Sequence, residues 1–344
     1  MSLMKRIYAV MITLLALAAG FHACSTDVDI YADYKEITIV YGLLDPNLDT
    51  NFVKINRAFL GPGDANEIAQ IADSSNYPGK LDSKIIVYRS GLYNTNFEKI
   101  REYPLDTITI HDKEPGLFYA PDQLLYYTTG RIFTNDDRYQ YKYELQVDRG
   151  DTLITATTSV VGGKNVYMTP ALLNFSSLSQ LGRLKWTECP NSSLYDIKIR
   201  FHYSEIISAV DTVRHVVDCY SRTAVESTIP LDNGMYTMNY PCSALFQSLA
   251  QEIGNDSLKL NVERIFFEPS VEVILSAGGE ELNNYIMVNG LSSSLVQTIP
   301  EYTNINGGYG VFSSRTQFHH YARLTSQTVI ELMSHSTWHF RQAQ

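Results

Sequence analysis

The sequence is short of cysteine, tryptophan and positive charge. Of its 344 residues, four are cysteine and two are tryptophan, whereas lysine and arginine together number 27 against 37 aspartates and glutamates. The formal net charge is −10. Because the phosphates of nucleic acid require a basic face, this balance argues against nucleic acid as a partner and favours an acidic, well-solvated surface.

The sequence also lacks the short motifs of common enzyme and metal sites. It has no Gly-x-Ser-x-Gly elbow, no His-Glu-x-x-His motif and no cluster of cysteine pairs. Gly307, Gly308 and Gly310 are not followed by the Lys-Ser/Thr of a phosphate loop, so we expect positive φ angles or a bulge beside a strand there. His319 and His320 would point to opposite faces of a strand, which disfavours a shared metal. We therefore predict no catalytic residue, no metal and no cofactor.

The longest apolar run lies at the N-terminus. After two basic residues, residues 7–19 are apolar, which is typical of a secretory signal and too short for a membrane-spanning helix. The segment FHAC then ends at Cys24. It resembles the lipobox of bacterial lipoproteins, whose cysteine is acylated after the signal is removed. We expect residues 1–23 to be this signal peptide and Cys24 to be the lipidation site, with the acyl chains as the membrane anchor.

The residues after Cys24 bear on location. Residues 24–35 read as an acidic tether, and their start, CSTDVD, resembles the signal that sends Bacteroidetes lipoproteins to the outer face of the outer membrane. A plain solvated tether is the alternative. We expect an outer-membrane, lipid-anchored protein, which could lie on either the cell surface or the periplasmic face of that membrane.

The mature chain would keep three cysteines, Cys189, Cys219 and Cys242. They would either form one disulfide among them or remain as three buried thiols.

The remaining composition is that of a β protein. Twenty-four Tyr and 14 Phe accompany segments in which apolar residues alternate with polar ones. We predict a mainly β protein with two immunoglobulin- or fibronectin-like β-sandwich domains and a few short helices. Residues 36–163 would form the first domain, and residues 164–344 a fibronectin III-like second domain with a helical insertion. Gly162-Gly163 marks the boundary.

Local sequence patterns predict where the strands and helices lie. Alternation predicts strands within 36–44, 51–61 and 83–91, with Ile37, Ile39 and Tyr41 on one face of the first and Val53 and Ile55 on one face of the second. A hairpin is expected at 139–161 with its turn at 148–151, and further strands at 271–279 and 323–334. Helices are expected at 64–72, capped by Asp64, and at 241–254. Trp186 is expected in the core, opposite the strand that begins near Tyr195.

Three segments carry a family resemblance: ITIVYGLLDPN, YELQVDRGDTLITATTSV and YTNINGGYGVFSSR. Together they resemble an uncharacterised family of Bacteroidetes outer-membrane lipoproteins whose genes often neighbour TonB-dependent receptors. The resemblance implies a non-enzymatic accessory or binding component of nutrient uptake, with a TonB-dependent receptor as a partner and a glycan or peptide as ligand. An adhesin or envelope-assembly protein is the alternative, and an enzyme acting on surface glycans or peptides has the least support.

Two sets of residues are candidate sites. Tyr139, Tyr141 and Tyr143 recur every two residues, so they share one strand face, which is either core or a platform for a ligand. Four Asp-Thr/Ser-aliphatic triplets match the short O-glycosylation site of exported Bacteroidetes proteins, although turns that precede strands also produce this pattern. The acceptors would be Thr107, Thr152, Thr212 and Ser257.

Overall fold

The structure is a computed structural model, which describes residues 36–343 except 59–63, 95, 133–137, 163–164, 177–179, 209–210, 255–261 and 291–300. It is 53 % strand and 15 % helix, so the expected mainly β, sandwich-type fold is confirmed. Cys24 and the tether 24–35 lie outside the described residues.

The elements fall into two lobes. The first lobe holds β1 (Ile37–Leu44), β2 (Thr50–Ala58), α2 (Ala65–Ala69), α3 (Ala72–Ser75), β3 (Asp82–Gly91), β4 (Glu98–Pro104), β5 (Asp106–Ile110), β6 (Gln123–Thr129), β7 (Tyr139–Asp148), β8 (Leu153–Thr158) and β18 (Ile305–Asn306). The second lobe begins with β9 (Met168–Thr169), β10 (Leu172–Leu173), β11 (Leu181–Trp186), β12 (Leu194–Ser208), β13 (Asp211–Val225), η1 (Glu226–Thr228), β14 (Leu231–Asp232) and β15 (Met235–Pro241). It continues with α4 (Ala244–Ile253), β16 (Arg264–Phe266), β17 (Val271–Gly278), α7 (Ser326–Ser334) and β20 (Phe340–Gln342), while α6 (Glu280–Gly290) and β19 (Gly308–Leu324) lie between the lobes.

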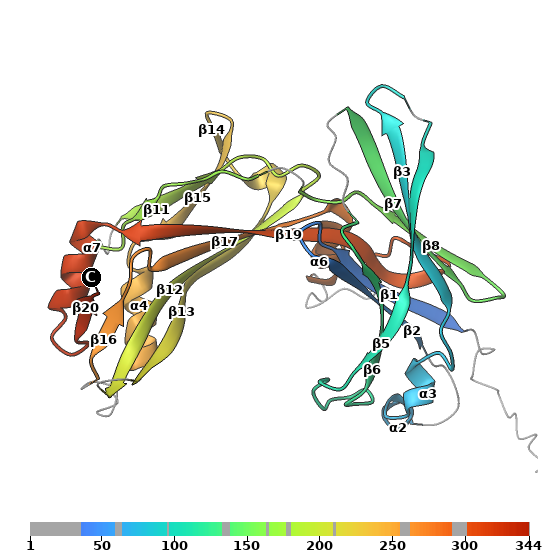
Figure 1. Cartoon of the computed structure of the whole chain (residues 1–344), viewed down its shortest axis with the longest axis horizontal. Helices are drawn as coiled ribbons and strands as arrows, with labels where there is room; N and C mark the ends of the chain where they lie inside the picture. The colour runs from blue at the N-terminus through green and yellow to red at the C-terminus, as the bar shows by residue number, and fades with distance from the viewer. Residues whose placement is uncertain are drawn as a thin grey trace, which may run out of the picture.

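One long sheet runs through both lobes. Its strand order is β20-β16-β12-β17-β19-β1-β2-β6-β5, with β13 beside β12 and β10 beside β19. β19 pairs in parallel with β1 through its first half and antiparallel with β17 through its second half, and Figure 1 shows it crossing from one lobe to the other. The expected domain boundary at residue 163 stays a prediction. In the strand pairing, Ile305, Asn306 and residues 308–314 pair with strands of the first lobe, although they come late in the chain.

Both cores lie on the same face of this long sheet. Side chains alternate between faces along a strand, and β19 pairs without a register shift. Its even-numbered Phe312 belongs to the core of the first lobe, whereas the even-numbered Ala322 and Leu324 belong to that of the second. The face that carries the odd-numbered residues of β19 is therefore opposite both cores, and we call it the open face.

A second sheet covers the core of each lobe. In the first lobe the sheet β18-β8-β7-β3-β4 packs Ile85 and Leu145 against Val40 and Phe312 of the long sheet. In the second lobe, Trp186 of the sheet β14-β15-β11-β9 packs on Tyr195 of β12, with their ring centroids 5.4 Å apart. Trp186 is 1 % exposed, so its expected core position is confirmed.

The helices match the sequence in part. Asp64 caps α2 by accepting a hydrogen bond from Asn66 N, as expected, but the helix ends at Ala69 and a separate turn, α3, follows. α4 ends at Ile253 and Gly254, with φ +59°, is its C-terminal cap, while Leu245, Leu249 and Ile253 are buried on one side of the helix. The start of the helix expected at 241–254 is wrong, because Pro241 ends β15 and Ser243 precedes the helix.

The strand expected at 323–334 is wrong beyond Leu324. Thr325 ends the strand, and its hydroxyl accepts a hydrogen bond from Thr328 N, which caps α7. Thr328 and Leu332, four residues apart, face the core on one side of this helix. The cap and the spacing outweigh the β-branched composition of the segment.

The glycine-rich segment serves strand packing, as expected. Gly310 has φ +112°, and a Cβ there would lie 2.0 Å from the carbonyl oxygen of Val40 on β1. Glycine is thus required where β19 approaches β1 most closely.

Candidate functional site

The three tyrosines predicted as a ligand platform share one face, but they differ in exposure. Tyr143 is 1 % exposed and belongs to the core of the first lobe. Tyr139 and Tyr141 are half-buried at the end of β7, with ring centroids 6.4 Å apart. Only these two lie where a ligand can reach them, at the end of the sandwich.

Arginines surround these two rings. Arg89 pairs across strands with Tyr141, and its guanidinium carbon lies 4.4 Å from the ring centre of Tyr139. On the next strand, Arg101 Nη1 donates to the hydroxyl of Tyr103 at 3.0 Å. We call these five residues, Arg89, Arg101, Tyr103, Tyr139 and Tyr141, the Arg–Tyr cluster. The sequence reasoning missed its arginines because their strand partners are not visible in the sequence.

The open face carries a second candidate site, over the first lobe. Tyr41 on β1, Phe52 on β2, Ile108 on β5 and Tyr309 on β19 are each 43–45 % exposed on this face. Phe52 lies 6.2 Å from Tyr127 of β6, measured between ring centroids. We call these five residues the aromatic patch. Its residues come from five adjacent strands of the long sheet, β19-β1-β2-β6-β5.

The helix α6 borders this patch. The ring of its Tyr285 meets that of Tyr41 edge-on at 6.2 Å, and their hydroxyls are 3.4 Å apart. This hydrogen bond, with burial, raises the pKa of Tyr41 to about 12. Ile286 and Met287 of the same helix are 43 % and 51 % exposed. Exposed aromatic and aliphatic side chains gathered on one sheet face are typical of interaction sites.

Two lysines give the patch a positive charge. Lys54 lies opposite Tyr41 on β2 and donates to Gln123 Oε1 at 3.3 Å. Burial and the charge of Lys113 lower the pKa of Lys54. Within the described part of the chain, neither lysine has a carboxylate within 4.0 Å. A negatively charged group on a partner would relieve this repulsion.

The open face of the second lobe carries a polar cluster instead. The carboxylate of Glu272, on β17, lies 3.0 Å from His202 Nε2 and 2.7 Å from His319 Nδ1. His319 and His320 point to opposite faces as expected, since His320 contacts Pro170 O on the core side. Across the described residues, no group of three or more His, Cys, Asp or Glu side chains is placed to hold a metal ion.

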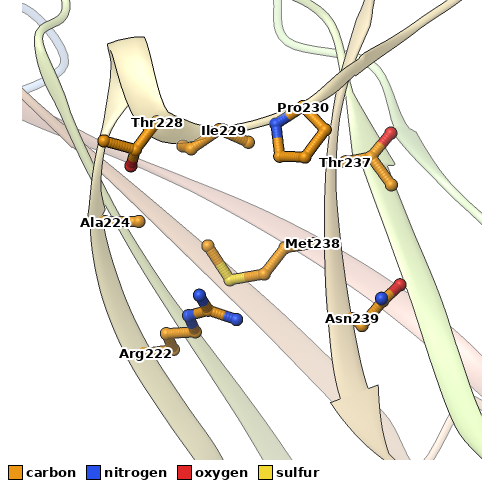
Figure 2. A pocket seen from close by; sticks show the side chains of 8 residues that line it. All are labelled: Arg222, Ala224, Thr228, Ile229, Pro230, Thr237, Met238 and Asn239. Atoms are coloured by element: carbon orange, nitrogen blue, oxygen red, sulfur yellow. The ribbon is translucent and has the colours of Figure 1, made fainter.

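A pocket of about 220 Å³ opens between β13 and β15. Figure 2 shows Arg222 and Ala224 on one strand, across the pocket from Met238 and Asn239 on the other. Arg222 is the charged residue of the lining, and no acid–base pair accompanies it.

The other predicted sites lie apart. The half-buried Thr107 is on β5, the exposed Thr152 in the β7–β8 turn and the exposed Thr212 on β13, while Ser257 lies outside the described residues. Their glycosylation stays a prediction. Cys189, Cys219 and Cys242 are free and buried, and burial raises the pKa of the first two to about 12. Among the described residues, no helix has the length and apolar character to cross a membrane.

Comparison with known proteins assigns no family, since no protein-family model and no curated protein matches the chain.

Proposed function

We propose that the protein is a non-enzymatic, lipid-anchored component of an outer-membrane uptake system that docks a receptor through the aromatic patch. The observation that carries this proposal is the patch itself, an exposed apolar surface on a sheet face opposite both cores. Tyrosine and phenylalanine are enriched where proteins bind one another. The anchor at Cys24 and the resemblance described above favour a partner in the same membrane.

The charge of the patch indicates which side chains a partner would present to it. Lys54 and Lys113 repel one another and have no carboxylate partner among the described residues, so a docking protein gains by placing Asp or Glu opposite them. We propose a TonB-dependent receptor whose exposed loops or rim supply apolar and acidic side chains. The patch lies on regular strands, which hold its rings in place without a partner.

Site-specific photo-crosslinking in intact cells tests this proposal. A photoreactive phenylalanine analogue at Phe52 should form one major adduct whose partner is an outer-membrane receptor. The matched control is Tyr167, an aromatic residue of the second lobe that is 64 % exposed and lies off the open face, where no such adduct should form. Equal labelling at both positions, or none at Phe52, contradicts the docking role.

The same experiment separates the alternative functions. An adduct between position 52 and a pilus or adhesin subunit would contradict the uptake function and support a function in envelope assembly. Tyr41→Ser with Phe52→Ser should abolish co-purification of the receptor without altering folding, because both side chains are 44 % exposed.

A further inference from the structure

The Arg–Tyr cluster concentrates positive charge in an acidic chain. The guanidinium of Arg89 has no carboxylate within 4.0 Å among the described residues, although Glu98 is its cross-strand neighbour. Among the described residues, the Arg101 guanidinium contacts the hydroxyl and ring of Tyr103. Two guanidinium groups on adjacent strands thus keep their charge available for an anion.

The surroundings of these arginines are rich in hydroxyl groups. Tyr103, on β4, and Tyr139 and Tyr141, on β7, flank Arg89 of β3 from both sides, because the strand order is β7-β3-β4. The Tyr103 hydroxyl already donates to Arg131 O at 3.1 Å, and Arg131 pairs with Asp49 at 3.1 Å. The cluster therefore combines flat rings, phenol hydroxyls and guanidinium groups.

The cluster lies at the end of the first lobe remote from Glu36, the first described residue. Arg149, in the β7–β8 turn, donates to the carbonyl oxygen of Glu36 at 2.9 Å, which fixes where the chain enters the lobe. Tyr139 is at the opposite end of β7, ten residues long. At about 3.3 Å per residue, about 30 Å separate the two ends.

We propose that the Arg–Tyr cluster binds a carboxylate-bearing sugar. A guanidinium fork pairs with a carboxylate through two parallel hydrogen bonds. Tyrosine rings offer flat faces against which a sugar ring packs, and the phenol hydroxyls exchange hydrogen bonds with sugar hydroxyls. This site is independent of the proposed docking function, because it lies on the other sheet of the lobe.

Isothermal titration calorimetry of the purified protein with trigalacturonic acid tests the proposal. Wild type should bind it, and Arg89→Gln and Arg101→Gln should each raise the Kd at least about tenfold. Arg89→Lys keeps the charge but loses the fork, so it should also bind more weakly than wild type. Arg222→Gln, at the pocket of Figure 2, removes an arginine elsewhere and should leave the Kd unchanged.

Two further ligands test which chemical groups the cluster recognises. Maltotriose, a neutral sugar of the same length, should not bind, and triglutamate should bind more weakly than trigalacturonic acid. The proposal is overturned if wild type does not bind trigalacturonic acid, if maltotriose binds equally, or if triglutamate binds as tightly. Thermal unfolding of each variant confirms folding, and unchanged crosslinking at Phe52 in Arg89→Gln keeps this result separate from docking.

Discussion

Phe312→Ala should destabilise both lobes although the residue belongs to the core of only one. Phe312 is fully buried in the first lobe, and removal of a buried Phe side chain costs about 3–5 kcal/mol. For the roughly 270 residues that the structure describes, this lowers the Tm by about 5–9 °C. Because β19 pairs with β1 and β17 in one sheet, we expect the lobes to unfold together.

The two tryptophans make this measurable. Trp186 and Trp338 are the only tryptophans of the chain, and both belong to the core of the second lobe. Tryptophan fluorescence therefore reports on the second lobe, whereas far-UV circular dichroism reports on both. In Phe312→Ala both signals should shift equally. A fluorescence transition that stays at the wild-type midpoint while circular dichroism shifts would refute coupling through β19. Phe52→Ser, on the open face, is the control and should change neither.

Three further predictions concern titration, thiols and the anchor. Burial raises the pKa of Glu272, but hydrogen bonds from His319 and His202 outweigh it and lower this pKa below 4.5. The stability that this shift contributes is present above the unfolded-state pKa and is lost as the pH falls through the folded-state pKa. The free energy of unfolding, measured by urea titration, should therefore fall more between about pH 5 and pH 3 in wild type than in Glu272→Gln. The buried thiols of Cys189 and Cys219, with pKa values raised to about 12, should not react with Ellman's reagent at pH 8 until the protein unfolds, and rapid native labelling of both contradicts their burial. Cys24→Ser should move the protein from the membrane pellet to the soluble fraction, and unchanged sedimentation with membranes argues against the lipid anchor.

Local features were predictable where one strong physical signal acted alone. The Trp186 position, the hairpin of β7 and β8, and the C-terminal glycine of α4 follow from burial, alternation and capping. α7 was missed because its β-branched residues favour a strand, whereas the Thr325 cap and the buried spacing of the helix prevail.

Long-range arrangement was not predictable in the same way. Ile39 and Tyr41 alternate as a half-buried strand should, yet the core side of β1 holds Val40 and Leu44 instead. Both faces of this strand are apolar, so alternation alone cannot identify the buried one. The crossing of β19 between lobes, and the meeting of Arg89 with Tyr139, depend on strand pairing across distant segments.

Oxidative footprinting of Tyr41, Phe52 and Tyr127 tests the docking claim most directly. Hydroxyl radicals should modify Tyr41 and Phe52 of the purified protein readily, since each side chain is 44 % exposed. In native outer membranes all three residues should be protected several-fold, with Tyr167 unchanged as an internal reference. Equal reactivity of the aromatic patch in purified protein and native membranes would mean that nothing docks on the open face.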